Sequence, residues 1–339
     1  MSLTNTQPPY PLHDSVKDRL HPEYVEFYNE HIINAQQVHL QPVSASRIGG
    51  KLIPGGGDPL PVGKTQDIGL KRQQTPGTDD VQIRCFTPEG EPPAAGWPVM
   101  IYYHGGGWVL GNINTENTVC TNMCSRSRYV VVTTDYRLAP EHPWPAAVHD
   151  SWETVLWVFG RGKSALSLDL SNVAIGGSSA GGNLAAIMTH KALSRPDLKI
   201  NFTTQLLIVP VTDNTASVES NPTYKSNEFT AALPAEKMLW YRRHYLPNEK
   251  DWTNPEASPL LYPAENFAKL PPAEVLVGEL DVLKFEGEDY ARKLREAGVP
   301  ANVHVMQGMP HPFLAMDAVL EAGRTAITIL CESLTRALK

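Results

Sequence analysis

The chain has 339 residues, of which 42% are hydrophobic and 19% charged, and its formal net charge is −7. A chain of this length and composition can bury a sizeable core, either as one large α/β domain with insertions or as two domains. An acidic balance without a basic tract excludes a typical nucleic-acid-binding protein.

The N-terminal residues 1–9 carry neither the charged start nor the apolar stretch of a signal peptide. No apolar run in the chain is long enough to cross a bilayer, so we expect a cytoplasmic protein without a membrane span. The four cysteines are too scattered for a disulfide framework. Cys120 and Cys124 lie four residues apart without further ligands nearby, which favours buried free thiols over a zinc site.

Residues 1–50 are expected to be rich in helix and separate from the rest of the chain. Pro22 suits the first turn of a helix. Three- and four-residue spacing then places an aromatic stripe on one helical face, made of Tyr24, Phe27, Tyr28 and His31. This stripe either packs on the body of the protein or covers a pocket, and the two interpretations are compatible.

After a connection rich in glycine and proline at residues 49–67, eight strands are predicted, at 67–73, 81–86, 99–103, 129–133, 173–177, 205–209, 273–277 and 302–306. Helices are predicted between and after the later strands, at 146–159, 180–194, 285–297 and within 312–338. Alternating strands and helices predict a mostly parallel sheet that is covered on both faces.

About sixty residues separate the strands at 205–209 and 273–277. They include a predicted helix at 233–245 that carries Met238, Trp240, Tyr241 and Tyr245. A segment this long between neighbouring strands is typical of a functional lid. Together with the N-terminal helices it can form a cap, and the alternative is a structural elaboration far from any site.

The stretch that organises the chain is the G-x-S-x-G sequence from Gly177 through Ser179 to Gly181, which stands between a predicted strand and a predicted helix. This context is typical of a nucleophile elbow, in which residues two before and two after the serine must be very small. The following helix N-terminus directs free N–H groups towards the serine. Ser178 is a rival nucleophile in a poorer steric frame, and an ordinary glycine-rich or phosphate-binding turn is the simpler alternative.

The sequence His104-Gly105-Gly106-Gly107-Trp108 follows the predicted strand at 99–103 directly. Consecutive glycines let the backbone approach a ligand and direct N–H groups at it. Before a nucleophile elbow, such a loop is typical of an oxyanion hole.

A nucleophilic serine needs a base and an orienting carboxylate, which in this fold class follow in the order Ser, Asp, His. Asp281 and His311 come just after the strands at 273–277 and 302–306, at the sheet edge where ligands bind. Glu279 and Glu286 compete for the role of the acid, and His304 competes for the role of the base from mid-strand.

These motifs, together with Asp135-Tyr136-Arg137-Leu138-Ala139-Pro140 and Met309-Pro310-His311, resemble the hormone-sensitive lipase family of α/β-hydrolases from about residue 97 to the end. The resemblance implies an α/β-hydrolase fold with an eight-stranded, mostly parallel sheet and a helical cap. It divides the chain into cap helices at 1–50, core at 51–211, a cap insertion at 212–255 and core at 256–339.

Carried over residue by residue, the resemblance implies Ser179 as nucleophile, Asp281 as acid and His311 as base. The N–H groups of Gly106, Gly107 and Ala180 would form the oxyanion hole. The chain departs from the family at two positions: Ser178 stands where Asp is usual, which removes a carboxylate partner for nearby structure, and Pro312 stands where Gly is usual.

We therefore predict a serine carboxylesterase that hydrolyses short- to medium-chain esters through an acyl-enzyme, with no cofactor and no metal. Its expected partner is a small-molecule ester, with no nucleic acid, and a homodimer is left open. An amidase or deacetylase acting on N-acyl or O-acetyl small molecules with the same triad is the nearer alternative. A non-catalytic small-molecule binding protein of this fold is the remote one.

Overall fold

The computed structural model describes residues 9–48 and 54–338, so the predicted N-terminal segment is described only between residues 9 and 48. Its centre is one sheet of eight strands in the order β1-β2-β4-β3-β5-β6-β7-β8. The strands are β1 Lys64–Leu70, β2 Val81–Thr87, β3 Trp97–Tyr103, β4 Val130–Asp135, β5 Leu168–Ser178, β6 Thr204–Ile208, β7 Ala273–Gly278 and β8 Ala301–Met306. Strand β2 pairs antiparallel with β1 and β4, and all other pairs are parallel, which confirms the predicted sheet.

The predicted first strand at 67–73 is wrong at both ends, because β1 runs from Lys64 to Leu70. Beyond Leu70 the backbone N–H groups leave the ladder for a carboxylate. Gln73 donates to Glu153 Oε2 at 2.8 Å, and Thr75 donates to Glu153 Oε1 at 2.7 Å. A buried acid on a helix therefore ends a strand whose sequence pattern continues.

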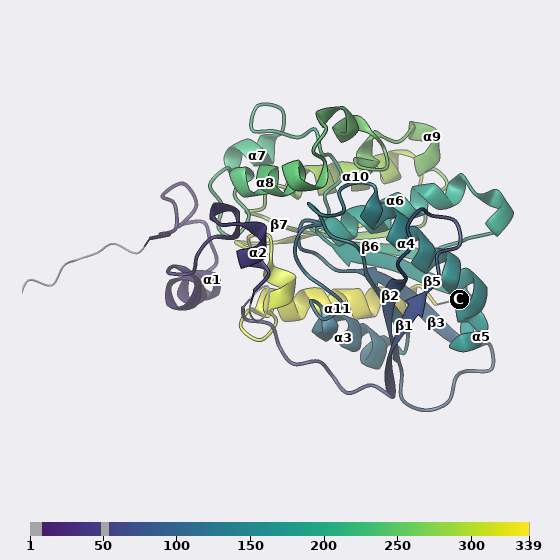
Figure 1. The fold of residues 1–339 in the computed structure, drawn as a ribbon. Coiled ribbons are helices and arrows are strands. Elements are labelled where there is room, and N and C mark those ends of the chain that lie inside the picture. Colours follow the sequence, from purple (N-terminus) through teal and green to yellow (C-terminus); the bar gives the residue numbers. More distant parts are fainter. Residues whose placement is uncertain (1–8, 49–53, 339) are drawn as a thin grey trace, which may run out of the picture.

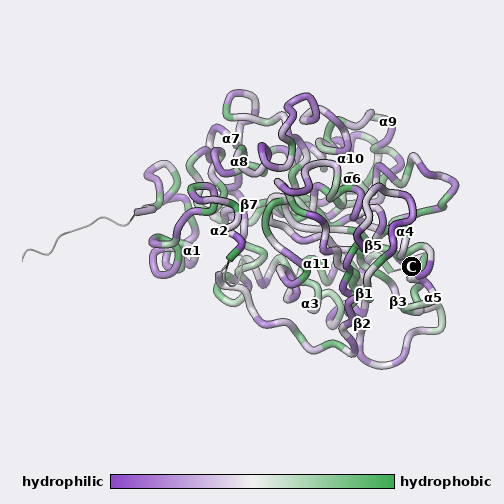
Figure 2. Tube along the Cα trace, in the orientation of Figure 1, coloured by the Kyte–Doolittle hydropathy of each residue, from purple (hydrophilic) through white to green (hydrophobic). Residues whose placement is uncertain are grey.

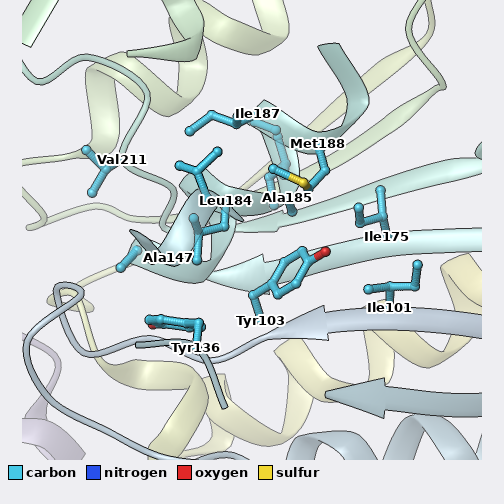
Figure 3. Close-up of a cluster of buried hydrophobic side chains, with 14 of the residues drawn as sticks. Ile101, Tyr103, Tyr136, Ala147, Ile175, Leu184, Ala185, Ile187, Met188 and Val211 are labelled. Carbon is cyan, nitrogen blue, oxygen red and sulfur yellow. The ribbon is translucent and has the colours of Figure 1, made fainter. Parts of the chain in front are cut away.

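Helices cover both faces of the sheet (Figure 1). One face carries α3 Asn117–Ser127 and α11 Glu321–Arg336, and the other carries α4 Ala146–Trp157, α6 Ala180–Leu193 and α10 Lys284–Glu296. Side chains of β3 alternate between two apolar clusters: Ile101 and Tyr103 pack with α6, whereas Met100 and Tyr102 pack with α3 and α11 (Figure 3 shows the α6 side).

Helix α4 ends at Trp157, two residues before the predicted end, and a π-helical turn Val158–Gly162 follows with non-helical backbone angles at Gly160. Three shorter elements also belong to the body of the protein, α5 Lys163–Ala165 and the 3₁₀ turns Pro196–Leu198 and Phe313–Met316. In Figure 2 the hydrophilic residues gather largely in peripheral loops and on the outer faces of helices.

Two segments far apart in the sequence lie together beyond the carboxyl ends of the strands (Figure 1). The N-terminal one contains α1 Pro22–Phe27, a π-helical turn Tyr28–Ile32, a 3₁₀ turn Val38–Leu40 and α2 Val43–Ser46. The segment between β6 and β7 enters this region with α7 Pro222–Ser226 and α8 Ala235–Tyr245. It then leads to the start of β7 through the 3₁₀ turns Glu249–Thr253 and Pro259–Leu261 and through α9 Ala264–Phe267, which packs on α10.

Several contacts join these two segments. The ring of His13 stacks on Phe229 with centroids 4.4 Å apart, and Arg19 donates to the carbonyl of Ser226 at 3.3 Å. The Val38–Leu40 turn also packs on α8. The N-terminal segment is anchored to the body as well, because Tyr24 and Tyr28 are buried in the apolar cluster that contains α11.

All four cysteines are buried and free, which confirms the prediction of buried free thiols for Cys120 and Cys124. Within residues 9–48 and 54–338, none of the helices combines the length and the apolar character that crossing a membrane would require.

Candidate active site

The loops after β3 and β5 meet because these strands are neighbours in the sheet, with Tyr103 opposite Gly177. Strand β5 ends at Ser178, and α6 begins at Ala180, so Ser179 is the single residue between them. Ser179 has φ 54° and ψ −115°, a conformation that non-glycine residues rarely adopt. This strained turn presents its hydroxyl at the carboxyl edge of the sheet.

The glycines on either side of Ser179 are required by close backbone packing. A Cβ on Gly177 would lie 2.5 Å from the carbonyl group of Gly181 and from the carbonyl oxygen of Tyr103. A Cβ on Gly181 would come closer still to the same Tyr103 oxygen. The steric expectation for the G-x-S-x-G sequence is therefore confirmed.

Ser179, His311 and Asp281 form a continuous chain of contacts. The Oγ of Ser179 lies 2.9 Å from His311 Nε2, and His311 Nδ1 lies 2.7 Å from Asp281 Oδ2. Asp281 is fully buried, and its Oδ1 accepts from the backbone N–H of Leu283 at 3.0 Å. With Nδ1–H directed at this carboxylate, Nε2 is the ring nitrogen that can accept the serine proton.

The residues that competed for these roles are engaged elsewhere. Glu279 accepts from the backbone N–H of Gly308 at 2.8 Å, and the buried Glu286 accepts from that of Thr212 at 2.8 Å. His304 Nε2 lies 2.7 Å from Glu274 Oε2 on the last two strands.

The loop Gly105–Gly107 is shaped by its own backbone and by His104. Gly106 and Gly107 have φ of 117° and 61°, in the region that favours glycine. Burial lowers the pKa of His104 to about 4, so its ring is neutral, and Nδ1 can donate to the carbonyl of Gly105 at 2.7 Å. The His104 ring stacks on Tyr136 with centroids 4.3 Å apart.

The N–H groups of Gly106, Gly107 and Ala180 have no acceptor among the residues that the structure describes. The two glycines lie beside Ser179 on one cavity, and Ala180 is the first residue of α6, so its N–H belongs to the helix N-terminus. Unpaired N–H groups in such a place can bind a developing negative charge.

A cavity of about 220 Å³ lies over Ser179 and His311. Its walls come from both outer segments, with Tyr24 and Tyr28 on one side and Tyr241 on the other. The ring of Tyr241 packs directly on Gly107, where a Cβ would collide with it. Pro312, the second departure from the family pattern, lines the same cavity.

Sequence reasoning missed two charged residues on this cavity, Glu116 and Lys237. Burial lowers the pKa of Lys237 to about 8, and its Nζ donates to the carbonyl of Ala232 at 2.7 Å. Glu116 Oε1 accepts from Ser178 Oγ at 2.5 Å. Ser178 itself brings no carboxyl group to this place, and Glu116 supplies one from another part of the chain.

No group of three or more His, Cys, Asp or Glu side chains that could hold a metal ion occurs in the described part of the chain.

The sequence pattern of Glu116 and Lys237 gave little signal, because a single acid after a glycine loop and a single lysine on a helix are commonplace. Only the folded chain brings them to the cavity.

Comparisons with known proteins identify the family of this chain and several similar proteins. A sequence model of the alpha/beta hydrolase fold family matches residues 100–315. The chain is 47% identical to an AB hydrolase superfamily protein of Schizosaccharomyces pombe, over 96% of each chain. It is 36% identical to Esterase LipI of Mycobacterium tuberculosis, over 73% of this chain and 75% of that protein. The structure of EstE1, a thermostable carboxylesterase cloned from a metagenomic library, matches with a TM-score of 0.74 at 32% identity, covering 89% of this chain and 94% of that one.

Proposed function

We propose that this chain works through an acyl-enzyme formed on Ser179. The chain belongs to the alpha/beta hydrolase fold family, with hormone-sensitive-lipase-like relatives, and is a carboxylic ester hydrolase. The observation that carries the proposal is the unbroken contact chain from Ser179 Oγ through His311 to the buried Asp281. A binding protein without catalysis has no need of a base 2.9 Å from a strained serine.

In this mechanism Ser179 Oγ attacks the ester carbonyl carbon while its proton passes to His311 Nε2. Asp281 keeps Nδ1–H in place and stabilises the imidazolium that forms. The oxyanion accepts hydrogen bonds from the N–H groups of Gly106, Gly107 and Ala180, where each donor is worth about 3–4 kcal/mol in comparable enzymes.

The tetrahedral intermediate collapses when His311 returns its proton to the departing alkoxide, which leaves as the alcohol. A water molecule then gives a proton to His311 and attacks the acyl carbon. Collapse of the second intermediate, with the proton passing to Ser179 Oγ, releases the carboxylic acid and restores the enzyme.

The substrate class follows from the cavity. Its volume of about 220 Å³ is below the roughly 300–1,000 Å³ of sites that take drug-sized ligands, and Tyr24, Tyr28 and Tyr241 are among the residues that line it. We therefore propose monomeric esters with short to medium acyl chains, roughly two to eight carbons. The family machinery also suits amides, and no contact on this cavity favours them.

The roof of this site is proposed to be a cap made of residues 1–50 and the insertion at 212–255. Support comes from the stacked rings of His13 and Phe229, and from the position of Tyr28 and Tyr241 on the same cavity. Since Tyr241 also contacts Gly107, this cap reaches the oxyanion loop itself.

The experiment compares wild type, Ser179→Ala and Ser178→Ala on p-nitrophenyl esters of graded acyl length. We expect Ser179→Ala to lower kcat by about 10⁴- to 10⁶-fold with the fold intact, while wild type shows a burst of p-nitrophenol and a preference for short chains. Activity that survives Ser179→Ala and disappears with Ser178→Ala would overturn the assignment of the nucleophile. A rate that jumps on long-chain triglyceride emulsions would overturn the substrate class.

A further inference from the structure

One acid at the floor of the cavity takes no part in the proposed triad. Glu116 stands at the N-cap of α3, lines the cavity with Ser178 and Ser179, and is only 8% exposed. A buried carboxyl group in such a place is costly unless hydrogen bonds compensate its loss of water. The hydrogen-bond partners of this carboxyl group therefore indicate its role.

The carboxyl group connects the two loops that the chemistry uses. Glu116 Oε1 accepts from Ser178 Oγ at 2.5 Å and from the backbone N–H of Gly105 at 3.4 Å. Ser178 immediately precedes the nucleophile, and Gly105 immediately precedes the two glycines of the oxyanion loop. A single oxygen atom thus bridges the nucleophile elbow and the oxyanion loop.

The helix that carries Glu116 does not account for this arrangement. The Glu116 side chain makes no capping hydrogen bond to α3, although its backbone stands at the N-cap. Its Oε2 is buried without a partner among the described residues, and so is the hydroxyl oxygen of Tyr102. The carboxyl group is therefore directed at the loops rather than at its own helix.

Burial raises the pKa of the Glu116 carboxyl group above its ordinary value. The hydrogen bonds from Ser178 Oγ and from the N–H of Gly105 act on this pKa in the opposite direction, towards lower values. Either protonation state retains an oxygen that can accept from Gly105, so the bridge does not depend on one ionic form.

We propose that Glu116 is a positioning residue, which fixes the distance between Ser179 and the oxyanion donors by joining Ser178 to Gly105. It would supply from α3 the carboxyl group that the resemblance to the family implies for position 178. The proposal rests on the function proposed for Ser179 and the glycine loop, because it assigns Glu116 no contact with the reacting atoms.

The geometry suggests a test by moving the carboxyl group. A Cβ on Gly105 would lie 2.7 Å from Ser178 Oγ, so the two positions are in contact. An aspartate introduced by Ser178→Asp can then reach the N–H of Gly105, with room left by Glu116→Ala. This double variant restores a carboxyl group between the loops but none at the N-cap of α3.

The experiment measures kcat, KM and Tm for wild type, Glu116→Ala, Glu116→Gln and Glu116→Ala/Ser178→Asp on p-nitrophenyl butyrate. We expect Glu116→Ala to lower kcat about 10- to 100-fold with KM within about threefold, because a small displacement of catalytic groups has this effect. Glu116→Gln retains the acceptor oxygen and should stay within about fivefold of wild type. The double variant should recover most of the loss in kcat.

Glu153→Gln is the matched control, since Glu153 is also buried and also accepts backbone N–H groups, but far from the cavity, at residues 73–75. It should lower Tm without changing kcat. An unchanged kcat in Glu116→Ala would overturn the proposal. So would a fall in kcat that is equally large in Glu116→Ala and Glu116→Gln and that adding Ser178→Asp does not correct. If Glu116→Ala does not fold, the glutamine and double variants decide alone. Ser179→Ala, assayed in parallel, tests the nucleophile separately.

Discussion

The floor of the cavity consists of loops that leave neighbouring parallel strands, whereas its roof consists of short helices from two segments far apart in the sequence. At the floor, glycines at 177 and 181 pack backbone on backbone, and Asp281 is fully buried. At the roof, side chains make the contacts, and the helix α1 has only six residues. We infer that changes at the floor act on kcat for every ester, while changes in the roof act selectively on larger substrates.

Among changes outside the proposed triad, those at the place where the two regions touch should show the largest effect. Gly107 has φ 61°, and a Cβ there would collide with the ring of Tyr241. We expect Gly107→Ala to lower kcat by about 10²- to 10³-fold on both acetate and hexanoate esters, because an oxyanion donor is displaced. Steady-state kinetics on the two esters measures this.

Gly298→Ala is the control for this change, since Gly298 also has positive φ, 83°, but a Cβ there meets nothing within 4 Å. It should keep kcat while losing some stability. Adding Tyr241→Ala to Gly107→Ala relieves the collision but not the backbone strain, so we expect partial recovery. A Gly107→Ala enzyme that discriminates between acetate and hexanoate would place this glycine with the roof instead.

Removal of the N-terminal part of the roof should have a smaller and more selective effect. Deleting residues 1–45 removes Tyr24 and Tyr28, which line the cavity, and exposes apolar side chains of α11 and the Phe313–Met316 turn. We expect a folded but poorly soluble protein whose kcat/KM falls about tenfold or more on bulky esters and less on acetate. If the truncated enzyme shows the same kcat/KM as wild type on both substrates, this segment is structural only.

The sequence predicted the site residues that directly follow strands better than those that distant side-chain contacts bring in, and the reason is physical. Ser179, His311 and the glycine loop stand directly after strands, so local pattern and sheet topology suffice to bring them together. Glu116 could not be predicted, because its contact with Ser178 joins positions 62 residues apart and depends on how α3 meets the sheet. The predicted end of β1 was wrong for the same reason, since Glu153, which binds the N–H of Gln73, lies 80 residues away in the sequence.

Lys237 is the roof residue for which stability rather than catalysis should respond. Its pKa is lowered to about 8 by burial, against 10.5 for an ordinary lysine, and burial together with the charge of Lys237 lowers the pKa of His39. Below pH 8 both the folded and the unfolded chain carry the proton, so the folded state bears the full cost of burying the charge. Between pH 8 and 10.5 the unfolded chain binds more protons, so this cost declines as the pH rises.

Lys237→Met should therefore raise the Tm at pH 7 by about 2 °C, corresponding to about 1 kcal/mol, and this advantage over wild type should shrink at pH 9.5. Thermal unfolding at the two pH values measures the difference, with the exposed Lys269→Met as a control that should show none. Catalysis on acetate should stay near wild type, because Lys237 contacts the carbonyl of Ala232 and no group of the proposed triad. A lower Tm at pH 7, or a large fall in kcat on acetate, would show that this part of the roof supports the floor directly.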